Sequence, residues 1–454
     1  MNAPSQPGSG TQTSPYLRSM AKVAIEYDAM GGKLPYRNLS ISMMLRGALD
    51  VSALTIGLQE IVRRQECFRM HFQLDGNEIL SLVEEWKETA IEVIDLTHEP
   101  PSASLASARA DTLRRREIPF TPSAGPLYRF ILYKVEGGVY LFSAIVDHLI
   151  FDGWSLGIFL EKLSEYYNSA LAGVVLHSKD TSLQYSDAAL WSSQRLFNGE
   201  MSSDLAYWRT QLNGVTSNGI FRKSDTGLAL AAMPGENDMV PERRWIKFSE
   251  AGSREIVDSS RKSNSSLFVV LLASFAAVLA CRCDTDEVVV VTDVANRTNP
   301  DFLGIMGKLT NGAVLRLNVR ASATFADLLS HASAVTMLAL AHQELPFEHA
   351  TEICLNQGAA FDTVFGLQNF PVGKFPFSNV DAEIIDIDFG FGFTDLNIMF
   401  CEGEKTLGAL VYLNSAKSNF GYVESLLKQM ELIARAGIKS PQSTVSQLLE
   451  ATST

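Results

Sequence analysis

Residues 139–153 read V-Y-L-F-S-A-I-V-D-H-L-I-F-D-G and join two kinds of predicted structure. The run 139–146 is short, apolar and rich in aromatic and β-branched residues, which predicts a buried strand. Residues 154–167 carry apolar side chains at helical spacing, which predicts an amphipathic helix. His148 and Asp152 therefore lie on a strand-to-helix connection, where a rigid frame exposes side chains that can carry function.

Two interpretations of this connection are open from the residues alone. A neutral imidazole at His148 can accept a proton from an attacking group. Alternatively, His148 is an ordinary loop residue and Asp152 caps the helix that begins near Trp154. The pattern H-x-x-x-D-G is short and recurs by chance, so the rest of the chain has to decide between them.

Composition limits the possible classes of protein. The chain has 454 residues, enough for two domains or subdomains. Its net charge of −13 argues against a nucleic-acid-binding surface and against a polybasic membrane anchor. The cluster Arg114–Arg116 is interpreted as the solvated end of a helix rather than as a docking patch. Residues 266–281 are too short to span a bilayer and predict a buried helix.

The cysteines and the N-terminus indicate a cytoplasmic protein. The five cysteines match no metal or redox motif, so we expect reduced thiols. Residues 1–15 are rich in Ser, Gly, Pro, Gln and Thr and lack the apolar core of a signal peptide. We expect this tail to be disordered.

The loop at 147–153 resembles the signature H-H-x-x-x-D-G of nonribosomal peptide synthetase condensation domains, in the chloramphenicol acetyltransferase-like superfamily. Other landmarks resemble the family in its order and spacing: R-R-Q-E-C-F-R-M-H-F at 63–72, Y-S-D-A-A-L-W at 185–191, Y-W-R-T-Q-L at 207–212, M-G-K-L-T-N-G at 306–312 and A-H-Q-E-L-P-F-E at 341–348. The ordered set is far more specific than any one of these motifs.

The resemblance implies an α/β (α+β) fold. It implies two chloramphenicol-acetyltransferase-like subdomains in a V shape, with the active site in the tunnel between them. We expect the N-terminal subdomain, which carries the signature loop, at 16–185 and the C-terminal one at 186–454, after the tail 1–15.

The resemblance also implies roles for the loop residues. His148 corresponds to the second His of the signature, which accepts a proton from the nucleophile or orients it. Asp152 forms a structural ion pair with Arg297, and the Gly153 amide is expected near the oxyanion. Asp147 replaces the first His of the signature. It is interpreted as structural, so Asp147→His should leave activity unchanged or raise it. A local pair between Asp147 and His148, or an inactive domain, are the alternatives.

Substrate-facing residues are harder to assign. Trp154, Ser155 and Asn311 are expected to line the tunnel, although Trp154 also suits a core position. His342 is interpreted as scaffold. The resemblance implies no metal and no permanently bound cofactor. It implies a phosphopantetheine arm supplied by an acyl or peptidyl carrier protein, and a small-molecule acceptor. The remaining length has no room for an adenylation domain, so we expect a free-standing, monomeric enzyme that meets its carrier protein in trans.

Three functions follow for comparison. The first is a condensation enzyme that transfers a carrier-bound acyl thioester to an amine or hydroxyl. It would form an amide or ester in nonribosomal peptide or hybrid polyketide biosynthesis, including chain release. The second is a coenzyme-A-dependent transferase of the BAHD type, suggested by D-F-G-F-G at 388–392. The third is a non-catalytic carrier-docking domain.

Overall fold

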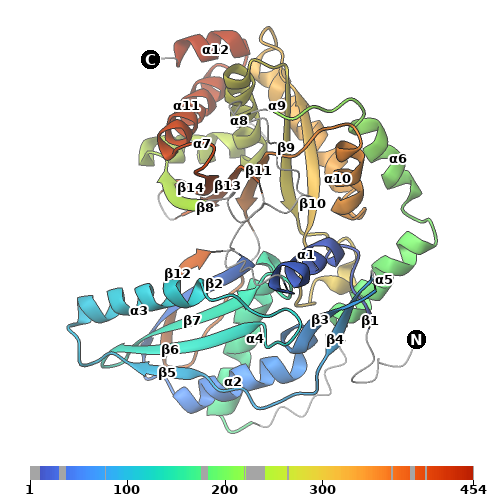
Figure 1. Cartoon of the computed structure of the whole chain (residues 1–454). Coiled ribbons are helices and arrows are strands. Elements are labelled where there is room, and N and C mark those ends of the chain that lie inside the picture. The colour runs from blue at the N-terminus through green and yellow to red at the C-terminus, as the bar shows by residue number, and fades with distance from the viewer. Residues whose placement is uncertain are drawn as a thin grey trace. The chain divides into compact units, whose positions relative to one another are not determined.

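The computed structural model describes residues 11–29, 37–76, 78–174, 183–218, 220, 241–262, 265–369, 372–388, 394–403 and 406–452 (Figure 1). The chain forms two compact units. The first unit consists of Met1–Asn198, Arg297–Thr310 and Phe370–Phe391, and the second consists of Gly199–Asn296, Asn311–Asn369 and Gly392–Thr454. The expected division at residue 185 assumed continuous subdomains. In the structure, the segments 297–310 and 370–391 belong to the first unit. The first of them binds Asp152 through Arg297, and the second contributes a strand to the sheet of that unit.

The first unit is built around a five-stranded sheet. Its strand order is β12 (Val380–Asp388), β2 (Asn38–Gly47), β7 (Val139–Asp147), β6 (Tyr128–Glu136), β5 (Glu92–Asp95). Strands β6 and β7 form an antiparallel hairpin, and β7 is the predicted buried strand. The pairing of β12 with β2 is antiparallel and brings a late segment of the chain to the sheet edge.

Helices cover this sheet on both faces, with α3 (Pro101–Arg116) on one face and α2 (Val51–Arg64) on the other (Figure 1). Helix α4 (Gly153–Leu171) packs against α2, and buries the apolar side chains that the sequence predicts. Asp152 caps α4 and Asp50 caps α2, each by accepting a hydrogen bond from a backbone N–H of the first turn. The capping interpretation of Asp152 is therefore correct.

A smaller sheet completes the first unit, together with α1 (Arg18–Ala29), η2 (Glu66–Arg69), η3 (Pro300–Phe302) and α5 (Tyr185–Phe197). Its order is β1 (Thr11–Gln12), β4 (Glu78–Val83), β3 (Met70–Asp75). Strand β1 lies within the tail that was expected to be disordered. Its antiparallel pairing with β4 corrects that expectation for residues 11–15, and residues 1–10 lie outside the described residues.

The arginine cluster at the end of α3 is not simply solvated. Arg116 is 3% exposed, and its guanidinium forms an ion pair of 3.1 Å with the buried Asp388. Arg115 binds Glu92 of β5 through two hydrogen bonds. The cluster therefore fastens α3 to the sheet. Asp388 opens the D-F-G-F-G stretch, whose other residues lie outside the described part.

The second unit contains a mixed six-stranded sheet. Its strand order is β10 (Asn311–Asn318), β9 (Glu287–Val294), β11 (Thr363–Gln368), β13 (Leu396–Glu402), β14 (Leu407–Asn414), β8 (Pro241–Lys247). The buried helix predicted at 266–281 is α8 (Leu267–Cys283), and β9 follows it in the sequence. The other helices of the unit are α6 (Ser202–Gln211), α7 (Glu250–Lys262), α9 (Phe325–Ala341), α10 (Phe347–Leu355), α11 (Phe420–Lys439) and α12 (Val445–Ala451).

Helix α8 packs against α7, α9, α11 and α12, which explains why nearly every one of its side chains is apolar. Within the described parts of the chain, none of the helices combines the length and the apolar character that a membrane crossing requires. All five cysteines are free thiols, as the sequence predicts.

Candidate active site

His148 follows the last residue of β7 and precedes α4, as the pattern of residues 139–153 predicts. Its backbone N–H donates to the carbonyl of Arg37 at 3.0 Å. Its side-chain Nδ1 lies 2.8 Å from the carbonyl oxygen of Phe151. Because a carbonyl only accepts hydrogen bonds, Nδ1 carries the proton of the neutral ring. The other nitrogen, Nε2, therefore keeps its lone pair, and it belongs to a side chain that is partly exposed.

The surroundings of His148 favour the neutral imidazole. Burial, and after it the positive charge of Lys308, lowers the pKa of His148 to about 4. The carbonyl of Phe151 and the carboxylates of Asp152 and Asp147 act in the opposite direction. At neutral pH the ring is thus a hydrogen-bond acceptor at Nε2 and a weak proton acceptor.

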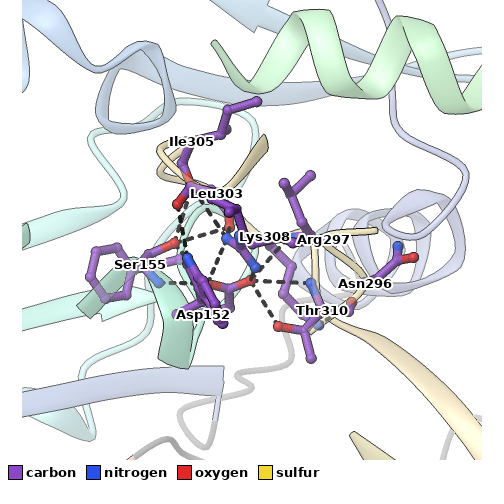
Figure 2. Close-up of polar contacts among 12 residues, drawn as sticks. Asp152, Ser155, Asn296, Arg297, Leu303, Ile305, Lys308 and Thr310 are labelled. Carbon is purple, nitrogen blue, oxygen red and sulfur yellow. Dashed lines mark hydrogen bonds and ion pairs between the residues drawn. The ribbon is translucent and has the colours of Figure 1, made fainter. Parts of the chain in front are cut away.

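Asp152 is the centre of a buried polar network (Figure 2). Its Oδ1 accepts hydrogen bonds from the backbone N–H and the hydroxyl of Ser155, at 2.9 and 2.7 Å. Its Oδ2 accepts from the backbone N–H groups of Leu309 and Thr310, both at 3.1 Å, and from the Thr310 hydroxyl at 2.8 Å. The carboxylate thereby joins the start of α4 to the segment 297–310.

Arg297 supplies the charge that balances Asp152. Its Nη1 lies 3.0 Å from Oδ2 and its Nη2 lies 3.2 Å from Oδ1. Burial by itself would raise the pKa of Asp152, but the Arg297 guanidinium and the hydrogen bonds from Ser155 hold it well below its usual range. The structure thus brings together the two residues that the resemblance paired.

Trp154 and Ser155 surround this ion pair. The indole of Trp154 lies over the guanidinium of Arg297, 5.5 Å from Cζ to the ring centroid, and its Nε1 donates to the carbonyl of Leu303. Ser155 is completely buried, and its hydroxyl donates to Asp152 and contacts Gly307. Both side chains were expected to line a tunnel, and the contacts observed here are with the polar network.

Gly307 has a conformation and surroundings that require glycine. Its φ of +145° is one that L side chains rarely adopt, and a Cβ atom there would collide with the ring of Tyr185. Its backbone N–H donates to the Ser155 hydroxyl at 3.0 Å. Two of the sequence landmarks, at 185–191 and 306–312, are therefore in contact and support the signature loop.

The sequence predicted a structural role for Asp147 but did not identify its partner. The Asp147 carboxylate is completely buried and binds Arg37, with Nη2 at 2.7 Å from Oδ2. The structural interpretation of Asp147 agrees with this ion pair, but Arg37 was missed. A carboxylate at the end of a buried strand signals that a cation must lie nearby, yet the sequence offers 38 lysines and arginines.

The sequence model of the condensation domain family matches residues 35–404. This chain belongs to the condensation domain family. Condensation domains are acyltransferase-type enzymes that form peptide bonds in nonribosomal peptide synthetases and work with the phosphopantetheine arms of carrier proteins. Membership also explains the order of the landmarks along the chain.

Malpinin synthetase of Mortierella alpina is 24% identical over 413 residues, which covers 88% of this chain and 5% of that protein. This chain therefore spans a small part of that relative. The first condensation domain of the calcium-dependent antibiotic synthetase, in complex with a substrate analogue, has a TM-score of 0.77 at 19% identity and covers 98% of this chain and 99% of that one. The SgcC5 protein of Streptomyces globisporus has a TM-score of 0.77 at 17% identity and covers 94% and 99%.

The other motif residues of this condensation domain have structural contacts in the second unit. Asn311 donates to the carbonyls of Gln343 and Leu345, and accepts from the backbone N–H of Phe347. These three bonds fix the connection between α9 and α10. His342 stacks on Tyr207 at 4.0 Å between ring centroids, and its Nδ1 lies 2.7 Å from Asp204. These contacts agree with the interpretation of His342 as scaffold.

Proposed function

We propose that this chain transfers an acyl group from the phosphopantetheine thioester of a carrier protein to an amine and forms an amide. The observation that carries the proposal is the tautomer of His148. Because Nδ1 donates to the carbonyl of Phe151, the lone pair of Nε2 is presented by a partly exposed ring on the family's signature loop.

The lone pair of Nε2 can accept the proton that amide formation releases. The acceptor nitrogen attacks the thioester carbonyl, the C–N bond forms, and the C–S bond breaks. The nitrogen gives one proton to Nε2 of His148, and this proton passes to the thiolate, which leaves as a thiol. The backbone N–H of Gly153 is at the start of α4, where helix amides lack intrahelical acceptors, and we propose it as a donor to the oxyanion.

The low pKa of His148 favours an amine over a hydroxyl as the acceptor. A neutral amine attacks with its own lone pair and sheds its proton readily once the C–N bond forms. A hydroxyl needs more help from the base, and an imidazole with a pKa of about 4 gives less of it. The SgcC5 structure contains a diol, (R)-(−)-1-(2-naphthyl)-1,2-ethanediol, so a hydroxyl is the competitor to include.

We infer further that the carrier protein acts in trans and that the setting is the cytoplasm. The support for the cytoplasm is the state of the five cysteines, which are all free thiols. Delivery in trans is tested directly when the carrier protein is added as a separate chain.

Intact mass spectrometry of two parallel reactions tests the proposal. One arm contains the protein with an acyl-loaded carrier protein, the other replaces the carrier by acyl-coenzyme A, and both contain amine and hydroxyl acceptors. We expect an amide formed from the carrier only, and a rate about 10²–10⁴-fold lower for His148→Ala. His98→Ala, an exposed histidine on the same unit, is the matched control.

Other outcomes contradict the proposal in distinct ways. Equal transfer from coenzyme A indicates the BAHD type of acyltransferase, and an ester product indicates a hydroxyl acceptor. Turnover that is indifferent to His148→Ala removes the proposed role of this residue. Binding of the carrier protein without any transfer supports a docking domain.

A further inference from the structure

Arg37 holds the main chain next to His148 at two points. Its side chain binds Asp147 through Nε, at 2.9 Å from Oδ1 and 3.1 Å from Oδ2, and through Nη2 at 2.7 Å from Oδ2. Its backbone carbonyl accepts the N–H of His148 at 3.0 Å. Arg37 therefore binds both Asp147 and His148. It directly precedes Asn38, which pairs with Asp147 in the register of strands β2 and β7.

Asp147 extends this hold past His148. Its Oδ1 also accepts the backbone N–H of Leu149 at 2.9 Å, and its carbonyl accepts the N–H of Ile150 at 3.1 Å. The Asp147 carboxylate thus has partners before and after His148 in the chain. Arg37 and Asp147 are 6% and 0% exposed, so solvent competes little for these bonds.

We propose that Arg37 is a positioning residue that acts through Asp147 to fix the main chain of His148. With the main chain fixed, Nδ1 of the imidazole reaches the carbonyl of Phe151 and Nε2 keeps its lone pair. The planar guanidinium is suited to this task, because its two-point contact with a carboxylate sets an orientation as well as a distance. The proposal rests on the proposed function only in taking Nε2 of His148 as the reacting group.

The tautomer of His148 is the sharpest readout, because a merely structural loss of stability does not change it in folded protein. Long-range ¹H–¹⁵N correlation spectra of ¹⁵N-histidine-labelled protein distinguish a protonated Nδ1 from a bare Nε2. The signal of His148 is assigned by its absence in His148→Ala. We expect the wild-type ring to show a single Nδ1–H tautomer.

Two variants remove the positioning contact. Arg37→Met removes the guanidinium, and Arg37→Met/Asp147→Asn removes both charges while an amide oxygen remains for the N–H of Leu149. We expect both to show averaged tautomers of His148. We also expect about a 10²-fold lower kcat with little change in KM, as for other misplacements of a reacting group by about 1 Å. Arg37→Lys keeps the positive charge but lacks the planar two-point contact with Asp147, so its kcat should lie between those of Arg37→Met and the wild type.

The control is Arg115→Gln, which breaks a two-point contact with Glu92 on β5, two strands from β7. If Arg37→Met fails to fold, the charge-neutral double variant decides the question. A wild-type His148 tautomer and a kcat equal to that of the Arg115→Gln control in the double variant would overturn the proposal. If the tautomer changes but His148→Ala retains full turnover, the positioning role stands and the proposed function falls.

Discussion

Arg297 Nη1 lies 3.0 Å from Asp152 Oδ2, in an ion pair whose side chains are 1% and 0% exposed. The pair joins two segments that are 145 residues apart in sequence, the start of α4 and the segment 297–310. Burying two charges costs desolvation energy that their attraction barely repays, so such a pair adds little stability by itself. What it provides here is a fixed connection beneath the loop that carries His148.

Asp152→Asn should destabilise the fold strongly. The substitution leaves the buried guanidinium of Arg297 without its carboxylate, and loss of one partner of such a pair costs about 3–5 kcal/mol of unfolding free energy. Urea unfolding of the variant and the wild type measures the difference. Glu165→Gln, in the exposed pair with Lys162, is the control and should change stability by less than about 0.5 kcal/mol. A loss as small as that of the control would contradict the prediction.

Turnover should not fall near pH 6.5, where an ordinary histidine takes up its proton. The proposed reaction needs the deprotonated ring of His148, and a pKa of about 4 keeps the ring deprotonated as the pH falls through 6.5. Profiles of kcat/KM between pH 5.5 and 8 should therefore show no loss near pH 6.5 that depends on His148. Such a loss, if the acceptor amine itself does not titrate there, would mean that the ring is more basic than the structure indicates.

Lys308→Met should move the acid limb of kcat/KM, which lies near pH 4 in the wild type and is seen when the profile is extended below pH 5.5, to higher pH. The ammonium group of Lys308 lowers the pKa of His148, so its removal raises that pKa towards the ordinary value. Methionine keeps an unbranched side chain of similar bulk and removes the charge, and with it the hydrogen bond to the Thr310 carbonyl. Lys162→Met, which removes a partly exposed lysine on α4, is the control. An unchanged limb in Lys308→Met would exclude the electrostatic role of Lys308.

Asp147→His, which restores the usual family residue, should be harmful in this chain. The resemblance by itself predicted unchanged or higher activity. The structure revises this prediction, because Arg37 would lose its carboxylate in a buried site, at a cost of about 3–5 kcal/mol.

Urea unfolding of a double-mutant cycle checks the revision. Asp147→His in an Arg37→Met background should cost clearly less than Asp147→His alone, because no buried cation remains to be stranded. Equal costs in the two backgrounds would show that the pair does not couple.

Local patterns in the sequence predicted the elements that frame the site. Residues 139–146 became β7, because a short apolar run rich in aromatic and β-branched residues is typical of a buried strand. The helix after Asp152 became α4, because its apolar residues recur at helical spacing. The apolar run at 266–281 likewise became the buried helix α8. The pair Asp152 and Arg297 was reached only through the resemblance, since nothing local connects them.

Contacts that depend on distant segments were not predictable in this way. The edge strand β12 pairs with β2 although more than three hundred residues separate Gly47 from Val380. The burial of Arg116 follows from its pairing with Asp388 in that same strand. An arginine in a run of three looks solvated until the segment that covers it is known.

The sequence by itself determined the family, the signature loop and the residue that we propose to react, because these depend on residue identity and order along the chain. The tertiary structure decided which nitrogen of His148 is free, why its pKa is low, and which arginine balances Asp147. Those properties depend on distance and burial. The hydrogen bond of 2.8 Å from His148 to the Phe151 carbonyl, and the effect of the Lys308 charge on His148, both depend on distances between atoms. Only the folded chain sets those distances.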